Sequence, residues 1–258
     1  MANSKQKDYH DEEYDASAFY ETYIAADNAF SEDVMERCIE VFHNTFASDT
    51  VKGDTLIDAS LSAITFQLFP AADKFKNIIL LESSDNSIDT IQKWINKEPG
   101  AIDKSHVGMF HYSLKGESAG WEEQEEKVRS AIRKVLKWDI NQEDSLSSLQ
   151  LPKADCVISF TYLELACKTH DMYRDRLKQL SSLLNVGGHL MLFVVINISY
   201  YIVGKHTFAA LTCNEEFIRE AIADSGLVIK NSGNIDRMFD SRLTDLEYFA
   251  HFVCVKEN

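Results

Sequence analysis

Short apolar runs that alternate with amphipathic segments constrain the fold of this chain more than any other feature. Four predominantly apolar runs of strand length predict buried parallel strands at 55–59, 77–81, 155–160 and 190–196. Between these runs, apolar residues recur at helical spacing and predict helices at 88–95, 128–136 and 172–184. Because strands that alternate with helices form doubly wound sheets, we expect an α/β fold with helices on both faces.

The two ends of the chain carry further predicted elements. Apolar residues at helical spacing around 34–42 indicate one of two helices that precede the sheet. The glycines at 187 and 188 end the 172–184 helix, and Asn214 caps a helix over 215–225. The final apolar runs, 227–229 and 247–255, are expected to pair as antiparallel strands because no helix-sized segment separates them.

The sequence contains no internal repeat and no proline-rich linker. We therefore expect a single domain over 1–258, with an N-terminal helical lid at 1–50 and a Rossmann-like core at 51–258.

Charge and cysteine content exclude several classes of function. The net charge of −15 opposes binding to nucleic acid or to an anionic membrane surface. The five cysteines are widely spaced and form no CxxC pair, and the histidines show no metal-binding spacing, so we expect reduced thiols and no metal site. The first residues are polar and resemble no signal peptide, which predicts a cytoplasmic protein.

Six stretches, in the same order over nearly the whole chain, match one known enzyme family: 51–58, 97–99, 127–139, 154–159, 182–188 and 199–204. In these stretches the chain resembles the nicotinamide, indolethylamine and phenylethanolamine N-methyltransferases, which are class I S-adenosylmethionine-dependent methyltransferases. The resemblance implies a mostly parallel seven-stranded sheet with one antiparallel strand, preceded by helices that cover the active site. It also implies transfer of a methyl group from S-adenosylmethionine to a small amine or a pyridine-like nitrogen.

The loop after the first strand departs from the family pattern. The family has glycines here, which let the backbone approach the cofactor and adopt positive φ. In this chain the loop reads Asp58-Ala59-Ser60-Leu61-Ser62-Ala63, so the resemblance gives Ser60 and Ser62 the cofactor-binding positions. Leu61 is expected to project into the space of the methionyl group or to turn the loop away, which puts cofactor binding in doubt.

Three further positions correspond to cofactor contacts in the family. Glu82, at the end of the second strand, matches the acid that accepts hydrogen bonds from the ribose hydroxyls. Asp139 and Ile140 match an aspartate and an aliphatic residue beside the adenine.

The positions that correspond to the lid and the methyl acceptor are more apolar here than in the family. The paired tyrosines of the lid correspond to Phe19, Tyr23 and Ile24, so that only one tyrosine remains. Val194 stands where the family has an aspartate that faces the acceptor, and Ile198 stands where it has a small polar residue. Tyr201 matches the family and is suited to stacking on a flat ring.

These departures lead to three hypotheses. The first is a non-catalytic family member, a pseudoenzyme that keeps the fold as a binding or structural protein. The second is an active S-adenosylmethionine-dependent N-methyltransferase with a more apolar acceptor. The third is a carrier of an apolar small molecule in the former ligand cleft, although filling of that cleft by side chains is the simpler outcome. The sequence does not determine the oligomeric state.

Overall fold

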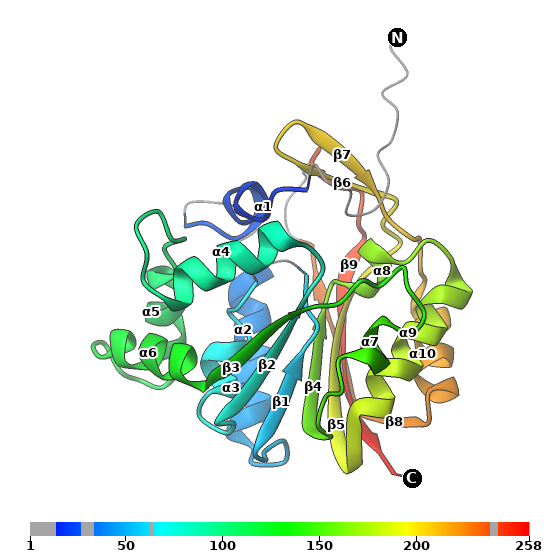
Figure 1. The fold of residues 1–258 in the computed structure, drawn as a ribbon, viewed down its shortest axis with the longest axis horizontal. Coiled ribbons are helices and arrows are strands. Elements are labelled where there is room, and N and C mark those ends of the chain that lie inside the picture. Colours follow the sequence, from blue (N-terminus) through cyan, green and yellow to red (C-terminus); the bar gives the residue numbers. More distant parts are fainter. Residues whose placement is uncertain (1–13, 27–33, 62–63, 238–241, 258) are drawn as a thin grey trace.

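Seven strands form one sheet in the order β3-β2-β1-β4-β5-β9-β8 (Figure 1). The structure, a computed structural model, describes residues 14–26, 34–61, 64–237 and 242–257. The strands of the sheet are β1 (Thr55–Asp58), β2 (Asn77–Glu82), β3 (Ile132–Lys137), β4 (Ala154–Phe160), β5 (Leu184–Ile196), β8 (Leu227–Asp236) and β9 (Tyr248–Lys256). A separate hairpin consists of β6 (Tyr200–Val203) and β7 (His206–Ala209).

Strand direction confirms the expected fold. The pairs β1–β2, β2–β3, β1–β4 and β4–β5 are parallel, whereas β9 runs antiparallel to both of its neighbours, β5 and β8. The sheet is therefore mostly parallel with one reversed strand, and the predicted pairing of the last two strands is confirmed.

The helices lie on both faces of this sheet. Figure 1 shows α2 behind the strands and α9 in front of them. The helices are α1 (Ala16–Tyr23), α2 (Glu36–Ala47), α3 (Leu68–Ala71), α4 (Asp85–Ile95), α5 (Ser105–Leu114), α6 (Trp121–Ala131), α7 (Ser145–Ser148), α8 (Leu163–Ala166), α9 (His170–Leu183) and α10 (Glu215–Asp224). As predicted, the Asn214 side chain accepts a hydrogen bond from Phe217 N and caps α10.

The predicted helix over 128–136 is wrong. The helix α6 ends at Ala131, and Ile132–Lys137 form β3, the edge strand beside β2. Ile132, Val135 and Leu136 fit a helical stripe by spacing, but they also form a strand with β-branched residues at two positions. Pairing with β2 selects the strand, because it gives the backbone hydrogen-bond partners along one side that spacing alone does not reveal.

The junction between α9 and β5 also differs from the prediction. The helix ends at Leu183, and β5 begins at the next residue, before the glycine pair. Gly187 has φ +81°, as expected for a glycine that takes the left-handed conformation, but it lies at an irregularity in the β4–β5 pairing and not at the helix end.

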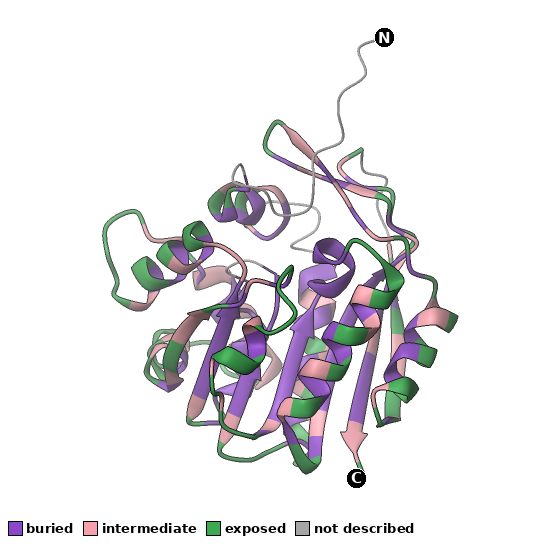
Figure 2. Cartoon of the chain, turned by 45° about the vertical axis from the view of Figure 1, so that its right-hand side comes forward, coloured by how far each residue is buried: buried purple, intermediate pink, exposed green. Residues whose placement is uncertain are grey.

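The interior of the sheet is apolar, and the burial pattern follows the layers. Figure 2 shows buried strands and exposed residues on the outer faces of the helices. On one face, Phe42 of α2 stacks on Phe193 of β5 with ring centroids 4.3 Å apart, so α2 is a core helix. All five cysteines are buried and free.

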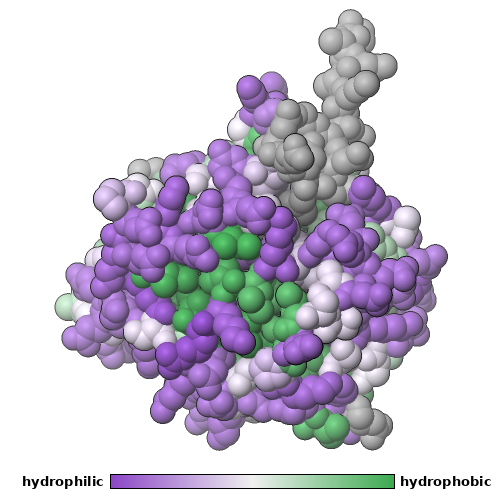
Figure 3. Space-filling view, in the orientation of Figure 1, coloured by the Kyte–Doolittle hydropathy of each residue, from purple (hydrophilic) through white to green (hydrophobic). Residues whose placement is uncertain are grey.

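One part of the front face is covered less completely. The connection from β3 to β4 contains only the one-turn helix α7. Figure 3 shows an apolar area near the centre of this face, bordered by hydrophilic side chains. Among the described residues, no helix is long and apolar enough to cross a membrane.

The helix α1 and the β6–β7 hairpin lie above the carboxyl ends of the parallel strands (Figure 1). Asp15 caps α1, and Ala16 N donates a 2.8 Å hydrogen bond to Asn86 Oδ1 of α4. On its other side, the Tyr23 hydroxyl group donates to Ile202 O at 2.8 Å and accepts from Ile202 N at 3.2 Å. These bonds hold the lid across the strand ends.

Candidate functional site: a closed crevice and an apolar cavity

Strand order places the expected ligand crevice between β1 and β4. Successive connections run from β1 toward β3 on one side and from β4 toward β5 on the other. In open α/β sheets, ligands bind outside the carboxyl ends of the strands where the connections diverge in this way. The residues that follow β1 and β4 therefore decide whether this protein has an open site.

The loop after β1 continues to pair with β4 and closes this crevice. Beyond the end of β1, Ala59 N donates to Ile158 O at 2.8 Å, and Leu61 N donates to Phe160 O at 2.9 Å. Phe160 N in turn donates to the Ser60 hydroxyl group at 3.1 Å. The chain thus remains hydrogen-bonded to β4 for three residues beyond the end of β1, and the side chain of Leu61 is fully buried.

Asp58, the last residue of β1, is part of the same closure. Its side chain is buried, and Gln67 Nε2 donates to its Oδ2 at 2.7 Å. Burial raises the pKa of Asp58 to about 6, while hydrogen bonds from Ser60 and Gln67 act in the opposite direction. The carboxyl group is therefore directed into the loop that follows it.

Glu82, at the carboxyl end of β2, has a buried cationic neighbour. Lys104 precedes α5 and is 2% exposed, with its ammonium group 4.7 Å from the Tyr20 ring centroid and 5.5 Å from that of Trp94. Burial lowers the pKa of Lys104 to about 7, whereas the charge of Glu82 raises it. Glu82 is itself 4% exposed, so this carboxylate lies in the interior and interacts with the Lys104 side chain.

Asp139 and Ile140 follow β3 and bond mainly within their own turn. The Asp139 carboxylate accepts from Asn141 N at 3.1 Å and from Gln142 Nε2 at 2.7 Å. Ile140 is buried, and its carbonyl group accepts a 2.7 Å bond from Arg176 Nε of α9. Ser62 lies outside the described residues.

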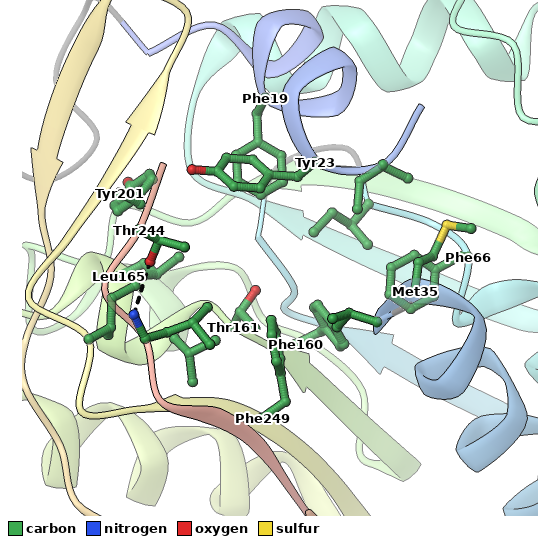
Figure 4. Close-up of a pocket in the computed structure, with 16 residues that line it drawn as sticks. Phe19, Tyr23, Met35, Phe66, Phe160, Thr161, Leu165, Tyr201, Thr244 and Phe249 are labelled. Atoms are coloured by element: carbon green, nitrogen blue, oxygen red, sulfur yellow. Dashed lines mark hydrogen bonds between the residues drawn. The ribbon is translucent and has the colours of Figure 1, made fainter. Parts of the chain in front are cut away.

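An apolar cavity remains beside the closed crevice and beneath the lid (Figure 4). The space open to the centre of a water molecule is about 60 Å³. Its walls come from α1, from the start of α2, from the loop after β1 and from the ends of β4, β5 and β9. The lining residues are Phe19, Tyr23, Ile24, Val34, Met35, Ile64, Phe66, Phe160, Thr161, Leu165, Val195, Ile198, Tyr201, Thr244, Leu246 and Phe249.

Most polar groups of this cavity are already used in the fold. The Tyr23 hydroxyl group binds the backbone of Ile202, and the Thr244 hydroxyl group accepts from Leu246 N at 3.3 Å. The Tyr201 ring stacks on Phe208 within the hairpin, at 5.3 Å between centroids. The cavity thus has an almost entirely hydrocarbon surface.

Thr161 is the exception. It follows β4 and has φ +46°, a conformation that is strongly disfavoured for a β-branched residue and costs about 1 to 3 kcal/mol. A 2.8 Å bond from its backbone N–H to Phe193 O holds it there. Its hydroxyl group makes no hydrogen bond in the described part of the chain and points into the space below the lid (Figure 4).

Comparison with known proteins identifies the family. The sequence model of the NNMT/PNMT/TEMT family matches residues 2–255. Indolethylamine N-methyltransferase from Oryctolagus cuniculus is 36% identical over 198 residues, which cover 77% of this chain and 75% of that protein. Nicotinamide N-methyltransferase from Sus scrofa is 32% identical over 243 residues, which cover 93% of this chain and 92% of that protein.

The chain belongs to this family.

Its members are S-adenosylmethionine-dependent small-molecule N-methyltransferases. Phenylethanolamine N-methyltransferase from Homo sapiens is a more distant member, at 29% identity over 76% of this chain and 69% of that protein. Among solved structures, magnesium protoporphyrin IX methyltransferase from Synechocystis PCC 6803 with bound S-adenosylmethionine has a TM-score of 0.58 at 15% identity, with 93% of this chain and 90% of that chain covered. The similarity to this solved structure shows that the chain has the methyltransferase fold.

At the β1–β4 crevice, the loop after β1 and the Glu82 side chain are both engaged within the fold. Ala59 and Leu61 pair with β4, and Leu61 has no exposed surface. Glu82 is engaged in the interior, beside Lys104.

The structure brings together only some of the residues that the sequence analysis selected. Tyr23, Ile198 and Tyr201 line the apolar cavity. Val194 is fully buried in β5 and does not line it, whereas its neighbour Val195 does, because successive residues of a strand point to opposite faces. The cofactor positions Ser60, Glu82, Asp139 and Ile140 lie outside the cavity.

Several lining residues were not selected from the sequence. Phe160 ends a predicted strand and Thr161 directly follows it, and that position was a usable signal. The contributions of Met35 and Phe249 come from segments far apart in the chain, and no local pattern indicates them.

Five buried polar side-chain atoms near the carboxyl ends of the strands have no hydrogen-bond partner among the described residues: Thr65 Oγ1, Gln67 Oε1, Ser83 Oγ, Trp138 Nε1 and Ser159 Oγ. Such atoms are uncommon in folded proteins, because an unpartnered buried polar group costs about 1 to 3 kcal/mol. No group of three metal-ligating side chains occurs in the part of the chain that the structure describes.

Proposed function

We propose that this chain is a non-catalytic member of the N-methyltransferase family, a pseudoenzyme that keeps the fold as a binding or structural protein. The observation that supports the proposal is the pairing of Ala59 and Leu61 with β4, which occupies the expected cofactor crevice. Methyl transfer is an in-line displacement that depends on the position of the sulfonium group relative to the acceptor. A displacement of about 1 Å can reduce such a rate by a factor on the order of 100.

The energy required to reopen the crevice is large enough to suppress cofactor binding. Opening breaks two main-chain hydrogen bonds, each with a net value of about 0.5 to 1.5 kcal/mol, and exposes Leu61, which costs about 1.5 to 3 kcal/mol. The total is about 2.5 to 6 kcal/mol. Since a ligand must first populate the open form, its apparent dissociation constant rises by a factor of roughly 10² to 10⁴.

Titration calorimetry with S-adenosylmethionine and S-adenosylhomocysteine tests this proposal. We expect no binding in the low micromolar range. The magnesium protoporphyrin IX methyltransferase from Synechocystis PCC 6803, which has been solved with bound S-adenosylhomocysteine, is a suitable positive control. A low micromolar dissociation constant for this chain would refute the non-catalytic assignment.

The alternative is an active N-methyltransferase with an altered loop. The five unpartnered polar atoms at the strand ends favour it, because a polar ligand that opened the loop would find hydrogen-bonding groups there. Incubation with labelled S-adenosylmethionine and a panel of pyridines, indolethylamines and phenylethylamines distinguishes the two. Methylated product at a rate above that of the Leu61→Asp variant would establish this alternative.

The apolar cavity favours a third function, transport or storage of a small apolar molecule. Thr161 is the one strained residue of the lining and has an uncommitted hydroxyl group, which is the feature expected of a group that orients a ligand.

Indole and benzothiophene are matched probes, because only indole has an N–H donor. If Thr161 orients the ligand, Thr161→Val weakens indole binding about fivefold, through loss of about 1 kcal/mol of hydrogen bonding, and leaves benzothiophene unchanged. If neither probe binds, the side chains fill the cleft.

We also infer a cytoplasmic location and a small-molecule ligand in preference to nucleic acid or a membrane surface. Five free buried cysteines fit a reducing compartment, and the net charge of −15 disfavours polyanionic partners.

A further inference from the structure

A second cavity lies on the other side of α2, away from the lid. It is lined by His43, Phe46, Ala47, Pro70, Asp73, Lys74, His111 and Lys115, and shares no residue with the apolar cavity. By the same measure its volume is about 170 Å³. We call it the His111 cavity.

His111 is a buried polar side chain with no hydrogen bond. It is 0% exposed, and neither ring nitrogen has a partner. The nearest charged group, Asp73 Oδ2, lies 3.8 Å from Nε2, which is beyond hydrogen-bond distance. The His43 ring lies across from it, 5.5 Å away between centroids. Two imidazole rings therefore meet at this cavity, and one of them has its whole hydrogen-bonding capacity unused.

The charges around the cavity are predominantly positive. Lys115 Nζ lies 2.7 Å from Asp73 Oδ2, and Lys127 Nζ lies 2.5 Å from Asp73 Oδ1, so two ammonium groups share one carboxylate. Lys74 pairs with Asp49, whose side chain is 62% exposed. Three lysines thus face two aspartates, in a chain whose overall charge is −15.

We propose that the His111 cavity binds a small oxyanion of the phosphate class. The imidazole N–H groups and the ammonium group of Lys115 are the donors that such an anion requires, and charge-assisted bonds of this kind are the strong ones. A metal ion is the weaker candidate, because Lys115 and Lys127 already compensate the only carboxylate that lines the cavity.

Oxyanion binding should strengthen as the pH falls. Burial lowers the pKa of His111, while the nearby Asp73 carboxylate raises it and Lys115 lowers it, so that the net shift is downward. The pKa of His43 is also lowered, by burial and by the charges of His111 and Lys115, against the opposite effect of Asp73. A bound anion favours the protonated rings and raises these pKa values. Binding therefore takes up protons at the rings. Affinity increases as the pH falls, by up to about tenfold per pH unit for each ring that becomes protonated, down to the pH of about 6 at which a phosphate monoester itself takes up a proton.

The other charged groups at the cavity are Asp73, Asp49, Lys74, Lys115 and Lys127. Burial raises the pKa of Asp73, but its contacts with His111, Lys115 and Lys127 lower it more. The histidines are therefore the groups that change charge on binding.

The test is a proton–carbon NMR titration of the histidine rings between pH 5 and 8.5, with sodium phosphate against sodium chloride at equal ionic strength. We expect phosphate, and not chloride, to raise the pKa values of His111 and His43. Lys115→Met and His111→Asn should each weaken phosphate binding about tenfold or more, because a hydrogen bond to a charged group contributes about 1.5 to 3 kcal/mol. His206→Asn, in the distant β7, is the matched control and should change nothing.

If phosphate and chloride shifted the pKa values of His111 and His43 equally, the shifts would come from ionic screening and the proposal would be overturned. An unaltered phosphate affinity in Lys115→Met would also overturn it. The Lys115 side chain is 23% exposed, so this variant is expected to fold even if His111→Asn does not. A parallel titration with glycerol phosphate shows whether the cavity prefers a phosphate monoester or the free phosphate ion. Either preference supports the site, and the tighter-binding compound indicates the class of ligand.

Discussion

Replacement of Leu61 with alanine tests whether the closed crevice is part of the fold or an obstruction in an intact site. The side chain is 0% exposed. The substitution removes three carbon atoms, each of which contributes about 0.8 kcal/mol when buried, and leaves a cavity that adds a further penalty. We expect the free energy of unfolding to fall by about 3 kcal/mol.

Urea denaturation measures this change, with an unaltered slope as evidence that the unfolded state is the same. Leu180→Ala is the matched control, because Leu180 is equally buried but lies in α9. It should destabilise the protein by a similar amount. Leu180→Ala should leave the affinity for S-adenosylhomocysteine unchanged. Leu61→Ala removes only the side-chain part of the opening cost and should not restore low micromolar affinity, since the main-chain bonds of Ala59 and Leu61 to β4 remain.

The opposite result is equally clear. If Leu61→Ala unfolds within about 0.5 kcal/mol of the parent, which is the range of surface substitutions, and binds S-adenosylhomocysteine more tightly, then Leu61 merely blocks a site that is otherwise open. The reasoning from burial and pairing would then be refuted.

Three further predictions follow from the same structure. The double variant Leu61→Gly and Val194→Asp should melt well below the parent in a thermal scan, because it adds backbone freedom and places a carboxylate at a fully buried position; an unchanged midpoint would contradict the filled cleft. Tyr23→Phe should cost about 1 to 3 kcal/mol in the same assay, because the carbonyl groups of Ile202 and Leu243 lose the hydroxyl group that donates to both; an unchanged midpoint would show that the lid is held otherwise. Burial raises the pKa of Glu164 from 4.5 to about 8, so between these values the folded state holds a proton that the unfolded state has lost. Stability then falls as pH rises, by up to about 1.4 kcal/mol per pH unit, and Glu164→Gln should flatten this slope in urea titrations; an identical slope would assign the pH dependence to another group.

The candidate site was only partly predictable from the sequence. The glycine-free loop 58–63 and the apolar residues near the lid indicated an altered ligand cleft, because residue type alone limits which backbone conformations and contacts are available. Tyr23, Ile198 and Tyr201 do line the cavity. The sequence position of Val194 does not show whether its side chain lines the cavity. Neighbouring residues of a strand face opposite sides of the sheet, and only the folded sheet decides which side holds the cavity.

The sequence by itself determined six of the seven strands of the sheet, the two helices ahead of it, the Asn214 cap and the antiparallel final pair, because each depends on local spacing or on residues close in the chain. Tertiary structure decided the rest. The segment 132–137 became a strand because β2 offered it a partner, although its spacing also fits a helix. The loop after β1 closed the crevice because β4, almost a hundred residues later in the chain, offered carbonyl groups to Ala59 and Leu61. Such pairings join residues whose separation in sequence carries no information about their distance in space, and for that reason only the folded chain reveals them.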